Sequence, residues 1–255
     1  MDFDKTTEVY REFLKRNGYN LSDILRIETQ IESIKDWSQV ASLESVMEWV
    51  QTKRSTCKMK ITDIHLNECK NWEFDQELGI IKHKSEKFFT VQGLRVQNSF
   101  EREVGPNGWD QPILKETGFS GGILGILRQK INSVPHYLLE AKAEPGNPRL
   151  IQLSPSLQAT FSNIKQSHGG RQPYLLEFFE RPAIFNCEVL FDQWMSEDGG
   201  RMYNKKNRCM LVQAPEGVNI KPNENFMWLS LFQIKELIKK DSIINPHVRG
   251  IISHF

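Results

Sequence analysis

Three ionisable side chains alternate along one stretch of the sequence that has the composition of a β-strand. In HYLLEAKAE, residues 136–144, Glu140, Lys142 and Glu144 stand at every second position, so an extended backbone places all three on one face. A lysine between two carboxylates shifts their pKa values and can prepare one of them to take up a proton. Two interpretations stay open, because such a face is either the solvated surface of an edge strand or the floor of a cleft.

Uncharged polar residues follow this strand. Ser154 and Pro155 together form a strong N-cap and first-turn signal, so we predict a helix over residues 153–166. Amides and hydroxyls on its outer faces suit a sugar or a base better than a metal ion, although an ordinary polar surface is an equally good interpretation. The side chains concerned are Gln158, Ser162 and Asn163.

The segment HGGRQPYL, residues 168–175, brings His168, Arg171 and Tyr174 within seven positions. Its two glycines allow the backbone to approach a ligand closely. Arg171 can bind a phosphate group through two parallel hydrogen bonds. A lone histidine is more often structural, so His168 is a candidate because of its neighbours.

Charged residues gather in SEDGGRMYNKKNR, residues 196–208, where Asp198-Gly199 predicts a tight turn between two strands. A charge run of this kind is ordinarily a solvated surface. On the return strand, however, alternate residues share a face, and either face can supply cations for a diphosphate. One set is Arg201, Tyr203, Lys205 and Asn207, and the other is Met202, Asn204, Lys206 and Arg208.

The composition and the missing motifs exclude several classes of protein. A formal net charge of +1 gives no electrostatic reason for binding nucleic acid or an anionic membrane. Four widely spaced cysteines indicate reduced thiols, and without an apolar leader or a membrane-length apolar run we expect a cytoplasmic protein. No phosphate loop, dinucleotide fingerprint, HExxH or GxSxG motif occurs, which leaves chemistry without metal or cofactor, or simple binding.

The elements that must position these residues fall into two regions. Apolar residues at helical spacing predict a helical arm over residues 1–58, with a break at Gly18 and Ser38 as a candidate cap. After Met59, short β-branched runs separated by turns predict strands, including a hairpin at Asn132-Ser133. With a further helix over 229–240, we predict an α+β domain over residues 59–255.

Eight blocks of the sequence resemble, in the same order, the NDP-hexose 2,3-dehydratase family. They extend from about residue 85 to the C-terminus and are more specific together than any single motif. The blocks are KFFTVQGLRV, REV with WDQPIL, EAKAEPGN, QLSPSLQATFSN, HGGRQPYL, SEDGGRMYNKKNR, WLSLFQIKELI and INPHVR.

This resemblance implies a Nudix-like mixed sheet flanked by helices, and activity on dTDP-4-keto-6-deoxyglucose in deoxysugar biosynthesis. Family members typically carry two tandem copies of the pattern, whereas this sequence has one, so we expect a homodimer. The predicted helix has Gln158 and Ser162 where a Nudix box has glutamates, which argues against a metal-dependent pyrophosphatase. We therefore expect neither a metal nor a cofactor.

The implied reaction is the loss of water across C2 and C3 of the sugar. A C4 ketone acidifies the C3 hydrogen, so a base and a group that stabilises the enolate oxygen suffice. Glu144 is the first choice for the base, followed by Glu197 and His168. Tyr203 or Lys205 would stabilise the enolate oxygen or protonate the departing hydroxyl group.

The resemblance also implies a set of substrate contacts. Three arginines are expected at the diphosphate or the sugar: Arg171, Arg201 and Arg208. The other expected contacts are Arg95, Trp109, Gln111, Lys142, Asn147, Gln152, Gln158, Ser162, Asn163, Tyr174 and Asn207. Two alternatives to the dehydratase remain: another lyase or isomerase acting on a nucleotide-linked keto sugar, and a sugar-nucleotide-binding subunit without catalytic activity.

Overall fold

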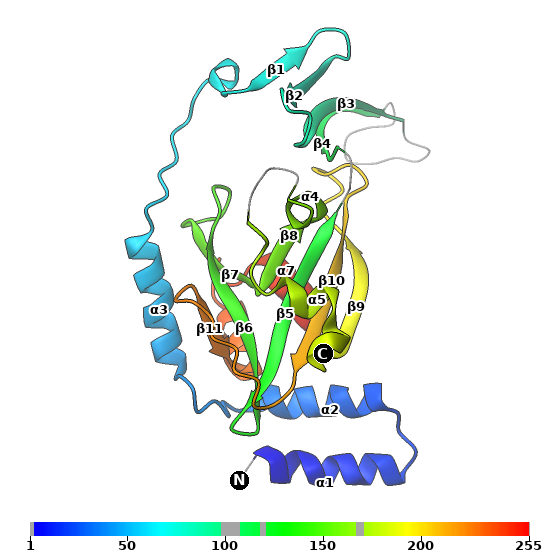
Figure 1. Ribbon diagram of the computed structural model, residues 1–255, viewed down its shortest axis with the longest axis vertical. Coiled ribbons are helices and arrows are strands. Elements are labelled where there is room, and N and C mark those ends of the chain that lie inside the picture. Colours follow the sequence, from blue (N-terminus) through cyan, green and yellow to red (C-terminus); the bar gives the residue numbers. More distant parts are fainter. Residues whose placement is uncertain (1–2, 98–107, 118–120, 167–170, 255) are drawn as a thin grey trace.

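The computed structural model describes residues 3–97, 108–117, 121–166 and 171–254. These residues form helices at the N-terminal end, a small antiparallel sheet, and a larger mixed sheet with helices on both faces (Figure 1). The small sheet lies beyond one end of the large sheet, and α1 and α2 lie beyond the other end (Figure 1). The prediction of an α+β fold is therefore confirmed.

Three helices begin the described chain: α1 (Phe3–Arg16), α2 (Leu21–Ile34) and α3 (Leu43–Thr56). Gly18, at φ +77°, terminates the first helix as predicted, because a left-handed residue there costs glycine little. The N-cap of α3 is Ser42, which accepts a hydrogen bond from the Ser45 amide. Ser38 instead places its hydroxyl 3.0 Å from Nε2 of His136. The division of the chain at residue 58 stays a prediction.

A buried ion pair attaches α2 to the large sheet. Arg128 donates to Glu32 at 2.5 Å, and Tyr137 donates its hydroxyl to the other oxygen of Glu32 at 2.7 Å. The side chains of Arg128 and Glu32 are 4% and 2% exposed. Each charge is removed from water, so each depends on the other for compensation.

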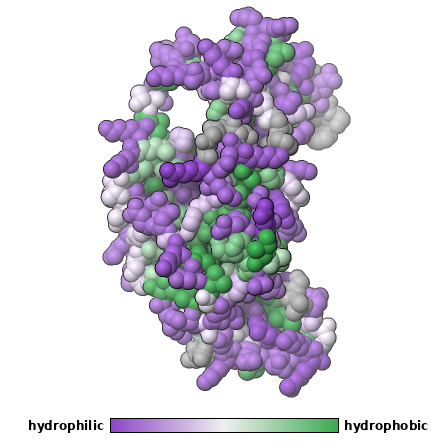
Figure 2. Space-filling view, viewed as in Figure 1, coloured by the Kyte–Doolittle hydropathy of each residue, from purple (hydrophilic) through white to green (hydrophobic). Residues whose placement is uncertain are grey.

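An exposed segment that includes a short 3₁₀ turn, η1 (Leu66–Glu68), connects α3 to the small sheet. Figure 2 shows this segment standing clear of the body of the molecule. The small sheet has the order β1-β2-β3-β4. Its strands are β1 (Trp72–Asp75), β2 (Ile80–His83), β3 (Thr90–Val96) and β4 (Trp109–Lys115).

The large sheet has the order β11-β6-β5-β10-β9, with β7 paired to β6 and β8 paired to β5. β10 runs parallel to β5, and the other pairs are antiparallel. Its strands are β5 (Gly122–Ile131), β6 (Val134–Ala143), β7 (Ile151–Pro155), β8 (Leu157–Thr160), β9 (Glu188–Ser196), β10 (Lys206–Ala214) and β11 (Phe226–Leu229).

The two central strands separate halfway along their length. The predicted hairpin at Asn132 and Ser133, both with positive φ, joins β5 to β6, and the strands pair as far as Leu127 and Leu138. Beyond this point β8 continues the pairing with β5, and β7 continues it with β6. The Ser156 hydroxyl bridges the fork, that is, the point where β5 and β6 separate. It accepts a hydrogen bond from the Leu127 amide at 2.8 Å and donates one to the Leu138 carbonyl at 2.5 Å.

The predicted helix over 153–166 is wrong. Residues 151–160 form β7 and β8, and a helix of one turn, α4 (Phe161–Ile164), follows with Thr160 as its N-cap. Strand pairing with β5 and β6 outweighs the local Ser154-Pro155 signal, because a helix here would leave the backbone groups of the separated strands without partners. Gln158 and Ser162 are therefore not one helical turn apart.

A turn forms at the predicted Asp198-Gly199, where the Arg201 amide donates to the Asp198 carbonyl at 3.0 Å, but it does not join the two strands directly. Residues 197–205 form a longer connection between β9 and β10, and its left-handed residue is Asn204, at φ 51°. This loop extends to the small sheet, where the Leu114 amide donates to the Arg201 carbonyl at 3.0 Å and the Tyr203 amide donates to the Leu114 carbonyl at 2.8 Å. Pairing with β4 therefore determines its shape.

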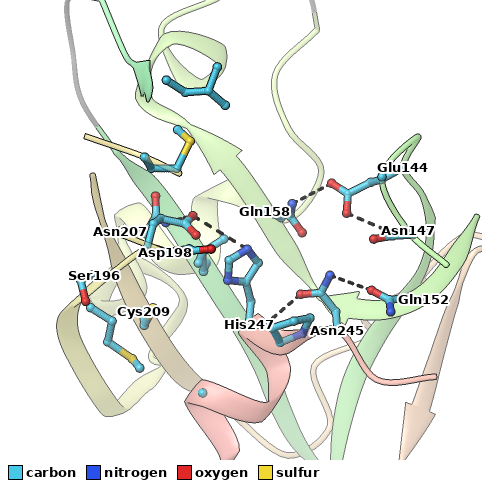
Figure 3. A pocket seen from close by; sticks show the side chains of 18 of the residues that line it. Glu144, Asn147, Gln152, Gln158, Ser196, Asp198, Asn207, Cys209, Asn245 and His247 are labelled. Carbon is cyan, nitrogen blue, oxygen red and sulfur yellow. Dashed lines mark hydrogen bonds and ion pairs between the residues drawn. The ribbon is translucent and has the colours of Figure 1, made fainter. Parts of the chain in front are cut away.

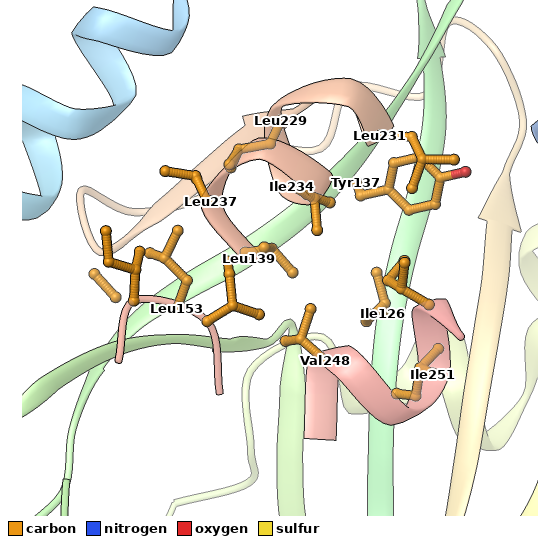
Figure 4. Close-up of a cluster of buried hydrophobic side chains, with 14 of the residues drawn as sticks. Ile126, Tyr137, Leu139, Leu153, Leu229, Leu231, Ile234, Leu237, Val248 and Ile251 are labelled. Atoms are coloured by element: carbon orange, nitrogen blue, oxygen red, sulfur yellow. The ribbon is translucent and has the colours of Figure 1, made fainter. Parts of the chain in front are cut away.

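Helices cover both faces of the large sheet. On one face, α6 (Leu231–Ile238) and α7 (Pro246–Ile252) pack their buried apolar side chains against β5, β6 and β7 (Figure 4). On the other face lie α5 (Leu176–Glu180) and a 3₁₀ turn, η2 (Pro182–Phe185). The helix predicted over 229–240 is confirmed as α6, and its capping box joins Ser230 and Gln233.

Candidate active site

A cleft of about 1040 Å³ lies where β5 and β6 have separated. Its walls come from segments far apart in the sequence: the β6–β7 turn, β8, the loop after β9, β10 and the start of α7. The polar side chains that line it include Glu144, Asn147, Gln152, Gln158, Glu197, Asp198, Asn207, Asn245 and His247. Figure 3 shows the His247 imidazole in the middle of this group.

Glu144 is held in the cleft wall by two neutral amides. Gln158 donates to Oε1 of Glu144 at 2.9 Å, and Asn147 donates to Oε2 at 3.4 Å. Lys142 donates to the backbone carbonyl of Gln158 at 3.5 Å. The carboxylate is therefore oriented by hydrogen bonds to side-chain amides.

The alternating face of β6 is not a solvated edge. β6 is an inner strand, which pairs with β5, β7 and β11. Burial raises the pKa of Glu140 above its ordinary value, while Lys142 opposes this effect. Of the three ionisable residues, Glu144 lines the cleft and directly follows β6, so the cleft interpretation applies to the position just beyond the strand.

The opposite wall carries a histidine beside a carboxylate. Nε2 of His247 lies 3.9 Å from Oε1 of Glu197, and Asn207 donates to the same oxygen at 2.6 Å. Burial lowers the pKa of His247, and this effect outweighs the opposing influence of Glu197 and Glu144. The imidazole is consequently neutral near pH 7 and able to accept a proton.

The start of α7 positions this histidine. Asn245 is the N-cap and accepts from the His247 amide at 2.9 Å, and Pro246 occupies the first helical position. Asn245 also donates to Oε1 of Gln152 on β7 at 3.3 Å. The sequence prediction missed His247 and Asn245 as site residues, although the block INPHVR contained the signal of an Asn-Pro cap followed by a histidine.

Cys209 lines the same cleft but is not suited to nucleophilic attack. Burial, together with the charge of Glu197, raises the pKa of its thiol to about 11. The thiolate is the reactive form of cysteine. Cys209 therefore stays protonated at neutral pH.

Several predicted residues lie in a smaller adjoining pocket. Ser162, Asn163 and Lys205 line this pocket, and Met202 lines both the pocket and the cleft. The Lys205 ammonium group lies 2.6 Å from Oε1 of Glu116. Tyr203, in the same loop, is 37% exposed, with the Lys115 ammonium group 5.8 Å from the centre of its ring.

The predicted residues of the small sheet do not line the cleft. Arg95 forms a bidentate pair with Asp110, at 3.0 and 2.8 Å, on an exposed surface. Trp109 donates to Gln111 at 2.6 Å, and Gln111 donates to the Gly200 carbonyl at 3.1 Å. These two residues therefore help attach the loop after β9 to the small sheet.

The remaining predicted contacts also lie outside the cleft. Arg208 pairs with Asp192, at 2.8 and 2.6 Å, on the face of β10 opposite Asn207. Tyr174 donates to the Lys221 carbonyl at 2.8 Å. Arg171 is exposed, and Arg201 donates to the Gly200 carbonyl at 3.4 Å. His168 lies outside the described residues.

In the part of the chain that the structure describes, no group of three His, Cys, Asp or Glu side chains has the arrangement of a metal site. Among the helices of the same residues, none is both long enough and apolar enough to cross a membrane.

Comparison with known proteins identifies the family. The family model described as NDP-hexose 2,3-dehydratase matches residues 43–255, and the chain therefore belongs to this family. It is 37% identical over 216 residues to a protein of Amycolatopsis orientalis and 36% identical over 205 residues to one of Saccharopolyspora spinosa. Both are named dTDP-4-dehydro-6-deoxy-alpha-D-glucopyranose 2,3-dehydratase.

These matches cover 82% and 80% of this chain but 44% and 40% of the relatives, so the chain spans less than half of their length. Among solved structures, it is similar to a Caenorhabditis elegans Ap4A hydrolase, at 12% identity and a TM-score of 0.31. That match covers 53% of this chain and 96% of the other. It is also similar to the Mycobacterium smegmatis Nudix hydrolase RenU, at 14% identity and a TM-score of 0.32, over 59% and 88% of the two chains.

Proposed function

We propose that this protein removes water across C2 and C3 of a dTDP-linked 4-keto-6-deoxyhexose, as a carbon–oxygen lyase of deoxysugar biosynthesis. Membership of the family and the printed names of its relatives support the substrate and the reaction. The observation that carries the proposal is the convergence of Glu144, Glu197 and a neutral His247 on one cleft.

The reaction needs one group that accepts a proton and later returns it. The base takes the C3 hydrogen, which the C4 ketone acidifies, and the electron pair is held as an enolate. The enolate then forms the C2–C3 double bond while the C2–oxygen bond breaks. The departing hydroxyl group takes up a proton and leaves as water, so a group that carries the C3 proton can supply it.

We assign this role to His247, in preference to the sequence-based first choice, Glu144. The neutral imidazole takes the C3 proton and becomes an imidazolium, which Glu197 at 3.9 Å and the charge of Glu144 stabilise. The imidazolium then protonates the departing C2 hydroxyl group. Glu144, held by Gln158 and Asn147, accepts hydrogen bonds from the sugar hydroxyls and fixes the orientation of the ring.

A single incubation separates the proposal from its alternatives. The purified protein is mixed with dTDP-4-keto-6-deoxyglucose and a mild reductant that traps the unstable product, and the mixture is followed by mass spectrometry. We expect a trapped product that has lost one water and gained two hydrogens from the reductant. A new product that has kept the water would indicate an isomerase, and binding without any new product would indicate a non-catalytic subunit. The cytoplasmic location and the homodimer stay predictions.

A further inference from the structure

We infer that the pocket beside the cleft binds the nucleoside of the nucleotide sugar, with Lys205 at the diphosphate. This inference rests on the proposed function for the identity of the ligand. The pocket has a volume of about 270 Å³. Its walls come from the β2–β3 connection, the residues around α4 and the loop that precedes β10.

Two phenyl rings form the apolar wall of this pocket. Phe88 and Phe89 are 39% and 40% exposed. Their other sides are supported by aromatic neighbours, since the Phe88 ring lies 4.6 Å from His83 and the Phe89 ring lies 5.1 Å from Trp72. Rings that are supported in this way lose little freedom on binding, and base stacking on aromatic side chains is favourable for every base.

The facing wall supplies uncharged polar groups. The Thr160 and Ser162 hydroxyls lie 2.9 Å apart, and the exposed side chain of Asn163 stands next to them in the sequence. An amide side chain offers both a donor and an acceptor, and the edge of a pyrimidine base offers the same two functions. The pocket therefore combines stacking surface with neutral hydrogen-bonding groups.

Lys205 belongs to the loop that borders both the pocket and the cleft. It lines the pocket, and its charge is close enough to His247 to lower the pKa of that residue. Met202, which lies in the same loop, lines both spaces. In a nucleotide sugar the diphosphate joins the nucleoside to the hexose, so a hexose beside His247 and a base beside Phe89 place the diphosphate near this lysine. The structure thus favours an anion-binding role for Lys205 over a catalytic one.

Equilibrium titration of the whole chain with dTDP tests the inference without any need for turnover. We expect Phe89→Ala to weaken dTDP binding about tenfold to a hundredfold, the range typical of one lost stacking contact. Phe89→Leu, which keeps most of the volume, should also weaken binding and guards against a folding defect. The matched control is Phe74→Ala, because Phe74 is an exposed phenylalanine of the same small sheet that lines a different pocket. This control should bind dTDP as the wild type does.

A second pair of titrations tests the diphosphate contact. Lys205→Met is combined with Glu116→Gln, so that no buried carboxylate is left without its partner. We expect the double variant to lose dTDP affinity but to keep its affinity for thymidine. Lys206→Met, a change of the exposed neighbouring lysine, is the control and should affect neither ligand.

The outcomes separate this inference from the proposed function. Wild-type turnover combined with unchanged dTDP affinity in both Phe89 variants would overturn the subsite and leave the function intact. Absence of turnover, together with dTDP binding that depends on Phe89, would overturn the function and support the subsite. No dTDP binding by the wild type at millimolar concentration, or equal weakening by Phe74→Ala, would also overturn the subsite.

Discussion

The pKa of the His247 imidazole is determined by several opposing influences. Burial and two lysines lower its pKa, whereas Glu197 and Glu144 raise it. Burial therefore keeps the resting imidazole neutral, and the two carboxylates will stabilise the imidazolium once a proton has been transferred. A base needs this balance at neutral pH, because it must be unprotonated before the reaction and stable when protonated.

Substitutions at His247 and Glu144 distinguish the two candidates for the base. If His247 takes the C3 proton, His247→Gln should lower kcat by about 10²- to 10⁴-fold and abolish the exchange of the C3 hydrogen with solvent, while dTDP binding persists. Glu144→Gln should mainly raise KM, because it alters a contact made in both the ground state and the transition state. Loss of C3 exchange in Glu144→Gln, with exchange kept in His247→Gln, would return the role of base to Glu144.

The pH dependence of kcat/KM reports on the same imidazole. Because the neutral form is active, kcat/KM should fall as the pH decreases through the lowered pKa of His247, below the ordinary value of 6.5. Glu197 raises this pKa, so Glu197→Gln should move the acidic limb to still lower pH. Asp192→Asn is the control, since Asp192 pairs with Arg208 away from the cleft. An acidic limb at the same pH in wild type and Glu197→Gln would contradict the assignment.

At the level of elements, the fork between β5 and β6 creates the site. The strands part after Leu127 and Leu138, and β7 and β8 take over their pairing. This arrangement brings the β6–β7 turn and β8 to one side of a space whose other side is formed by β10 and α7. At the point of separation, the Ser156 hydroxyl accepts a hydrogen bond from the Leu127 amide and donates one to the Leu138 carbonyl. These two backbone groups do not pair with one another there.

The attachment of α2 to the sheet depends on a compensated pair of buried charges. Glu32→Ala should reduce the free energy of unfolding by about 3–5 kcal/mol, because it leaves the guanidinium of Arg128 buried without its partner. Glu28→Ala is the matched control on the same helix, and its partly exposed pair with Arg11 should contribute less than about 1 kcal/mol. Urea denaturation of the full chain measures both values. Equal effects of the two substitutions would show that the buried pair has no special role.

At the level of the whole molecule, the surface of α1 is a candidate contact between two copies of the chain. Its buried residues Phe3, Thr7 and Leu14 face the protein, whereas Val9 and Phe13, one turn apart, are 70% and 61% exposed. Exposed apolar residues that lie together on one surface are typical of sites of association. Two-fold symmetry is the commonest way in which identical chains pair.

We predict that light scattering at micromolar concentration gives twice the chain mass of 29.7 kDa. Val9→Lys combined with Phe13→Glu should shift the mass toward the monomer without loss of secondary structure, because both side chains are exposed in the isolated chain. Lys5→Glu combined with Glu12→Lys, which changes charge on the same helix without changing its apolar residues, is the control. A fully active species of 29.7 kDa would show that pairing is not required.

The sequence by itself determined the features that depend on neighbours along the chain. Asn132 and Ser133 specify a hairpin through their tolerance of left-handed backbone, and Ser230 and Gln233 specify the start of α6 through their caps. The period of two predicted a shared face for Lys142 and Glu144; in the structure Glu144 directly follows β6, and both residues contact Gln158. The family could also be predicted from the sequence, because the eight ordered blocks are sequence motifs that can be recognised without a structure.

Only the tertiary structure decided which of these residues meet. The segment 151–160 carries a helix signal, yet it forms strands because the separated β5 and β6 offer it backbone hydrogen bonds from residues distant in the sequence. His247 is more than 100 residues from Glu144 along the chain. It lies close to Glu197 because α7 packs on the sheet. Burial lowers the pKa of His247 and raises that of Cys209. It is likewise a property of the packed molecule, because the neighbouring residues in the sequence do not determine how completely water is excluded from a side chain.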